Sequence, residues 1–152
     1  MTHEYDLDRF VKAQDPVYDR VLAELDAGQK KSHWMWFIFP QLVGLGRSMR
    51  SAFFGLESRE EAAAYLAHPV LGPRLVECTR LVLEHALDWR DAQRIFGDPD
   101  DLKFQSCMTL FSRAKPTDPI FQRAIDQVYG GVGCQPTLGM LRLAFLASLE
   151  EE

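Results

Sequence analysis

The dipeptide Asp-Pro occurs three times in this sequence, at Asp15-Pro16, Asp98-Pro99 and Asp118-Pro119. An aspartate at the N-cap accepts hydrogen bonds from the first free N–H groups of a helix, and proline suits the next position because it lacks an N–H group. Each pair therefore predicts the start of a helix. Gly28 and Gly130 are predicted to end helices, because a left-handed residue commonly follows the last turn.

Apolar residues between these signals repeat with the period of a helix. One set consists of Val17, Val21 and Leu25. A second set consists of Phe104, Cys107, Met108 and Phe111. A buried helix is predicted from Pro73 to about Ala86, and the segment 58–61 has the pattern of a capping box. Only the segment 36–39 is predicted to be extended, because it precedes Pro40. We expect an all-α fold, a single multihelical globular domain over residues 1–152, with about seven helices and little or no β-structure.

Composition narrows the class of protein. The 152 residues are 47% apolar and carry a formal charge of -5, which suits a domain with a substantial core and argues against non-specific nucleic-acid binding. Cys78, Cys107 and Cys134 follow neither a disulfide nor a zinc pattern, so we expect small core residues in a reducing cytosol. The alternative is that one of them is a catalytic thiol. The acidic N-terminus lacks a signal-peptide pattern, and the segment 34–46 is too short to span a bilayer. We expect a cytoplasmic protein with no metal, no cofactor and no membrane partner.

Polar groups interrupt the aromatic run from Lys31 to Gly46. Such groups must find hydrogen bonds or face a cavity, and an aromatic wall with a few polar groups suits a flat ring. In this interpretation Trp34 and Trp36 stack on a ring, whereas Ser32, His33 and Gln41 orient the ligand. If the protein is an enzyme that works without a metal, His33 is the candidate catalytic base. The alternative is that the aromatic residues are core and that His33 is structural.

Two neighbouring features predict contacts with an anion. A glycine-rich turn at 44–48 precedes a helix and carries Arg47, although a plain turn is the alternative. The helix after Pro99 carries a stripe of polar residues that could hold a phosphate or a ribose, and a solvated helix face is the alternative. The residues of this stripe are Lys103, Ser106, Thr109 and Arg113.

Several motifs resemble one protein family over about residues 7–146. They are Ser32-His-Trp-Met-Trp-Phe-Ile-Phe-Pro-Gln-Leu42, His68-Pro-Val-Leu-Gly-Pro-Arg-Leu75, Ile95-Phe-Gly97 and Pro99-Asp-Asp-Leu-Lys103. Together they resemble the bacterial family called domain of unknown function 1810. The resemblance implies a small, mostly helical, cytosolic bacterial protein.

A more distant resemblance concerns the YbiA-like, or NADAR, proteins, which are associated with ADP-ribose chemistry. The order of elements is similar, and the pair Lys103-Phe104 matches that family's Lys-Phe pair, but no segment matches its Glu-His-Tyr segment. This resemblance implies a nucleotide-like ligand such as ADP-ribose, bound by a sensor or processed by a hydrolase. The alternative is a non-catalytic interaction module or homodimer, with the tryptophan-rich run as an exposed hot spot.

Overall fold

The computed structural model describes residues 5–46 and 48–150, and these form ten helices and no strand. The helices are α1 (Asp8–Gln14), α2 (Tyr18–Asp26), α3 (Met35–Ile38), α4 (Met49–Phe54), α5 (Arg59–Ala67), α6 (Leu71–His85), α7 (Trp89–Phe96), α8 (Asp100–Ala114), α9 (Pro119–Tyr129) and α10 (Gln135–Glu150). The predicted all-α class is confirmed. The structure has more helices than the seven expected, because short helices such as α1 and α3 contain too few residues for an apolar period to be recognised.

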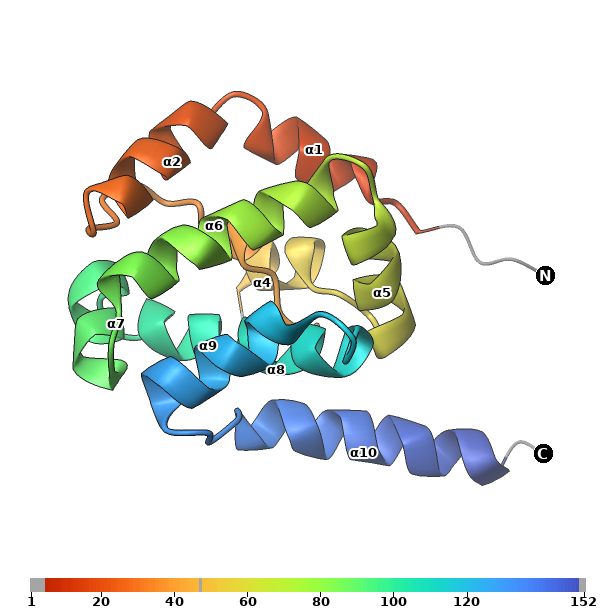
Figure 1. The fold of residues 1–152 in the computed structure, drawn as a ribbon. Helices are drawn as coiled ribbons and strands as arrows, with labels where there is room; N and C mark the ends of the chain where they lie inside the picture. Colours follow the sequence, from red (N-terminus) through yellow and green to blue (C-terminus); the bar gives the residue numbers. More distant parts are fainter. Residues whose placement is uncertain (1–4, 47, 151–152) are drawn as a thin grey trace.

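Helices α6 and α8 form the centre of the molecule. Helix α6 packs on α2, α5 and α9, while α8 packs on α5, α7, α9 and α10. Helices α1 and α2 lie above α6, and α10 lies below the rest (Figure 1). The buried apolar residues form one cluster, to which nearly every helix contributes.

Several predicted helix ends are confirmed. Asp118 caps α9 by accepting a hydrogen bond from the N–H group of Ile120, and Gly130 ends this helix with a φ of 63°. The hydroxyl of Ser58 caps α5 by accepting from the N–H group of Glu61. The Glu61 carboxylate accepts from Glu57 rather than Ser58, so the capping box is displaced by one residue.

Two predicted helix starts and the extended segment are wrong. Asp15 follows α1 instead of starting α2, and its carboxylate pairs with Arg74 at 2.9 Å. Asp98 does not cap α8, because Pro99 occupies the N-cap position. The segment 36–39 belongs mostly to helix α3. Of its residues only Phe39 leaves the helical conformation, because a proline restricts the residue directly before it.

The burial of the cysteines and the hydropathy of the helices are compared with the predictions made from the sequence. Cys78 and Cys107 are buried, as predicted, whereas Cys134 is half-buried. Burial raises the pKa of the Cys78 thiol to about 12, so this thiol stays protonated near neutral pH. Within the described ranges, every helix falls short of the length and apolar character that a membrane span requires.

Candidate functional site

Glu24, in the last turn of α2, holds the start of the aromatic run. Its Oε1 atom accepts hydrogen bonds from the N–H groups of Lys31 and Ser32 at 2.7 and 2.9 Å, and from the indole N–H of Trp34 at 3.0 Å. Its Oε2 atom accepts from the Ser32 hydroxyl at 2.6 Å. Burial alone raises the pKa of Glu24, but these hydrogen bonds outweigh it and lower the pKa to about 2. The carboxylate is therefore ionised at neutral pH.

This carboxylate determines where three predicted site residues lie. Ser32 is bonded to Glu24, and Trp34 is only 1% exposed, so neither is available to a ligand at the surface. His33 lies exposed between them, and no described residue forms a hydrogen bond with its ring. Sequence reasoning missed Glu24 because it precedes the run on a separate helix. The signal that points to it is Gly28, whose φ of 74° lets the chain turn back onto α2.

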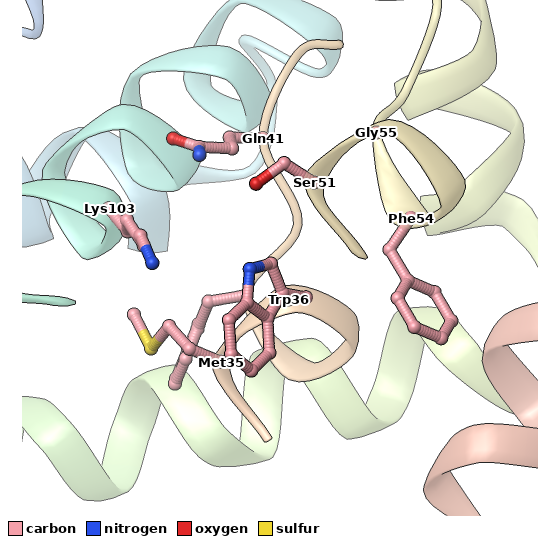
Figure 2. Close-up of a pocket in the computed structure, with 8 residues that line it drawn as sticks. Met35, Trp36, Gln41, Ser51, Phe54, Gly55 and Lys103 are labelled. Atoms are coloured by element: carbon pink, nitrogen blue, oxygen red, sulfur yellow. The ribbon is translucent and has the colours of Figure 1, made fainter. Parts of the chain in front are cut away.

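Trp36, Gln41 and Lys103 meet at a small surface pocket (Figure 2). Residues from α3, the segment that follows it, α4 and α8 line this pocket: Met35, Trp36, Phe39, Gln41, Ser51, Phe54, Gly55 and Lys103. Its volume of about 10 Å³ has room for about one water molecule. Figure 2 shows the amino group of Lys103 directed toward Trp36 and Met35, with Gln41 and Ser51 above the indole.

Positive charge surrounds the indole of Trp36. The Lys103 Nζ atom lies 5.0 Å from its ring centroid, and the Arg50 guanidinium lies 5.2 Å from it. Asp100 partly balances this charge, because it forms ion pairs with Lys103 at 3.2 Å and with Lys30 at 3.0 Å. Lys103 and Lys30 thus share one carboxylate, while Arg50 forms no ion pair with a described residue. The remaining positive charge favours an anion at this place.

Two polar groups in the pocket lack a partner among the described residues. They are the side-chain amide of Gln41 and the indole N–H of Trp36. The Ser51 hydroxyl is bonded to the Ser48 hydroxyl at 2.9 Å. The pocket therefore offers an amide, an indole N–H and an ammonium group to a bound molecule.

The glycines before α4 form a turn that brings the chain close to the pocket. Gly44 has a φ of 97°, a conformation that favours glycine. A Cβ atom at Gly46 would lie 2.2 Å from the Ser51 hydroxyl oxygen, so only glycine fits there. The Ser48 hydroxyl accepts from the N–H group of Ser51. This geometry agrees with the plain-turn alternative, while Arg47 lies outside the described residues.

The other polar residues of the α8 stripe lie away from Trp36. The Ser106 hydroxyl is buried and bonded to the Thr137 hydroxyl at 2.8 Å. The Thr109 hydroxyl donates to the carbonyl of Gln105 and accepts from the N–H group of Cys134. Both hydroxyls thus attach the beginning of α10 to α8.

Arg113 lines a second, larger groove between α5 and α10. This open groove has a volume of about 570 Å³ and is also lined by Arg59 and Arg142. The structure therefore brings Trp36, Gln41 and Lys103 together and separates them from the remaining described site residues. Those residues are Ser32, His33, Trp34, Ser106, Thr109 and Arg113. In the described part of the chain, no three His, Cys, Asp or Glu side chains are grouped to hold a metal ion.

The fold and the pocket define an all-α protein with an indole pocket rich in cations. The model of the family described as "Protein of unknown function (DUF1810)" matches residues 4–141, so the chain belongs to this family. This match confirms the resemblance carried by the run from Ser32 to Leu42.

A solved structure shares the same fold. It is the crystal structure of the conserved hypothetical protein Rv1873 from Mycobacterium tuberculosis, which is 49% identical to this chain with a TM-score of 0.85. The similarity covers 91% of this chain and 97% of that chain. No curated protein matches the sequence.

Proposed function

We propose that this protein binds an anionic small molecule with a flat ring, such as a nucleotide, at the Trp36 pocket. The observation that carries the proposal is the meeting of Trp36, Gln41 and Lys103 beside an excess of positive charge. An aromatic surface with a few polar groups is typical of small-molecule sites. ADP-ribose is the first ligand to test, because the pair Lys103-Phe104 resembles the NADAR proteins.

Each side chain has a distinct role in this proposal. The ring of the ligand stacks on Trp36, while Lys103 and Arg50 contact its phosphate groups. Gln41 and Ser51 form hydrogen bonds that orient it. The indole is already flanked by the two cations, so the incoming ring displaces one of them and the phosphate becomes its new partner.

Binding requires helix α4 to move, because the pocket has space for only about one water molecule. None of the side chains of α4 is buried, and Met49 at its start is 90% exposed. Phe54 attaches the helix to the core, because its ring lies 5.7 Å from that of Phe10 and 5.3 Å from that of Phe37. The proposed movement is therefore a shift of the exposed part of α4 about this contact. This movement enlarges the space beside Ser51 and Phe54 for the ligand.

We propose binding rather than turnover as the primary activity. General acid or base catalysis needs a titratable group within hydrogen-bond reach of the ligand. The pocket is lined by no histidine or carboxylate among the described residues, and His33 lacks an orienting carboxylate. His33 as a catalytic base stays a prediction. The hot-spot alternative has less support, because Trp34 is buried against Glu24.

The test is a thermal-unfolding screen with ADP-ribose, AMP, ribose and inorganic phosphate. A ligand at a hundredfold excess over its Kd stabilises the folded state by about 2.7 kcal/mol, a shift of several degrees. We expect this shift with ADP-ribose or AMP and its loss in Lys103→Ala. The matched control is Lys115→Ala, because Lys115 is exposed and lies outside the pocket. No shift with any nucleotide, or an unchanged shift in Lys103→Ala, would contradict the proposal.

A further inference from the structure

Helix α10 is apolar around its whole circumference but is mostly uncovered. Thr137 is its one buried residue, while Leu143, Leu146 and Leu149 are 69%, 45% and 52% exposed. Figure 1 shows α10 below the other helices, and its packing is chiefly on α8. A helix that is apolar on all sides is normally buried on all sides. This helix therefore has the composition of one that is covered by a further surface.

The exposed leucines form one continuous face. With about 100° per residue, Leu143, Leu146 and Leu149 fall within about 120° of the helix circumference. Leu141 and Phe145 lie on a different side, where they line the groove between α10 and α5. Gly139 belongs to the leucine face, and a Cβ atom there would meet nothing within 4 Å. The leucine face is thus open along its length. It consists of Gly139, Leu143, Leu146 and Leu149.

The two charged side chains of α10 have opposite signs, so they can pair with the same two residues of a second, antiparallel α10. Arg142 and Glu150 are the two charged residues of this helix, and they lie four residues before and four residues after Leu146. Neither forms an ion pair with a described residue. In an antiparallel pair of α10 helices centred on Leu146, each Arg142 is level with the Glu150 of the other copy, about 6 Å along the helix from the centre. Leu143 is likewise level with Leu149.

We propose that the leucine face of α10 binds the same face of a second copy of this chain, antiparallel and related by a two-fold axis at Leu146. A two-fold interface brings the same patch of both subunits together, so it requires a surface that is complementary to itself. The pairing covers the leucines and forms two Arg142–Glu150 ion pairs at its ends. It leaves the Trp36 pocket, which involves α3, α4 and α8, outside the interface.

The composition of the face favours a second copy over a lipid surface. Helices that lie on membranes carry several lysines or arginines on their polar face, whereas α10 has only Arg142. The net charge of -5 also opposes contact with an anionic bilayer. A second copy needs no additional charge, because each α10 supplies both members of the ion pair.

The first experiment measures the molar mass of the full chain by sedimentation velocity, from roughly 1 to 300 μM. We expect the mass to rise from 17.4 kDa toward twice that value as the concentration increases. Leu146→Glu places two like charges at the two-fold axis and should abolish this rise. The control is Leu87→Glu, because Leu87 is 74% exposed but lies outside α10. Circular dichroism confirms that both variants stay folded.

The second experiment tests the register. Arg142→Glu places two acidic residues opposite each other at both ends of the pair, so we expect dimerisation to weaken by about tenfold or more. The double variant Arg142→Glu/Glu150→Arg should restore it. A chain that stays monomeric throughout, or a dimer that Leu146→Glu does not affect, would overturn the proposal. A dimer in which the charge exchange fails to restore affinity would overturn the antiparallel arrangement.

Discussion

The aromatic segment from Trp34 to Phe39 and helix α10 are both strongly apolar, yet they have opposite fates. Trp34, Met35, Ile38 and Phe39 are buried, whereas α10 buries only Thr137. The two segments differ in the helices that pack against them and in the hydrogen bonds that hold them. Glu24 binds the beginning of the aromatic segment, and the Gln14 side chain donates to the carbonyl of Phe37 at 2.7 Å. Helix α10 has side-chain bonds to α8 only around its first turn. Apolar content alone therefore does not determine which segment becomes core.

The largest expected difference between the two regions is the cost of deleting an apolar side chain. Phe39 contacts the rings of Phe96 and Phe104 at 5.8 and 5.0 Å between centroids. Phe39→Ala should lower the free energy of unfolding by about 3–5 kcal/mol. Leu143→Ala should change it by less than about 0.5 kcal/mol, because this side chain is exposed. Urea unfolding at low protein concentration measures both, and similar losses would show that α10 is part of the stabilising core.

The second expected difference appears at acidic pH. The pKa of Glu24 is about 2 in the folded protein, against an ordinary value of 4.5. Because the folded pKa is the lower one, the stabilisation is complete above pH about 4.5 and is lost as the pH falls toward about 2. We expect the wild type to be more stable than Glu24→Gln at neutral pH and this advantage to disappear over that range.

The control for this pH measurement is Glu84→Gln, because Glu84 is exposed on α6. It should leave the pH profile unchanged. If Glu24→Gln also followed the wild-type profile down to pH about 2, the four hydrogen bonds would not stabilise the aromatic segment as the structure indicates.

The smallest expected effect concerns the attachment of α10. Ser106→Ala removes the bond between the buried hydroxyls of Ser106 and Thr137, and we expect a loss of about 1 kcal/mol. The loss should be local, with faster amide hydrogen exchange at the start of α10 and unchanged exchange in α6. Faster exchange throughout the molecule would instead show that this bond supports the whole fold.

The fold was largely predictable because helix periods and caps are local signals. The spacing of Phe104, Cys107, Met108 and Phe111 on α8 and the Asp118 cap of α9 involve residues a few positions apart. Helix α3 was missed because it has four residues, fewer than the period needs. The sequence also gave no reason to expect that α10 would be left exposed, because burial depends on the neighbours that a helix finds.

The candidate site was predictable only in part. Trp36 and Gln41 are neighbours in sequence, but Lys103 reaches them only because α8 packs beside the aromatic segment. The Ser106 and Thr109 hydroxyls lie on the same helix as Lys103, and the sequence predicts the same role for them. Both are instead hydrogen-bonded to residues at the start of α10. Helical spacing identifies which side chains lie near each other on a helix, whereas their partners are set by the surrounding helices.

The positions of the three tryptophans have a consequence for spectroscopy. Trp34 is buried, Trp36 lies beside two cations at the pocket, and Trp89 is 52% exposed on α7. Indole emission responds to the polarity of its surroundings, so the chain contains three natural fluorophores in three different environments. Trp34 reports on the integrity of the core and Trp36 on events at the pocket, while Trp89 serves as a solvent-facing reference. Replacing two indoles at a time turns the same protein into separate optical sensors without an attached dye.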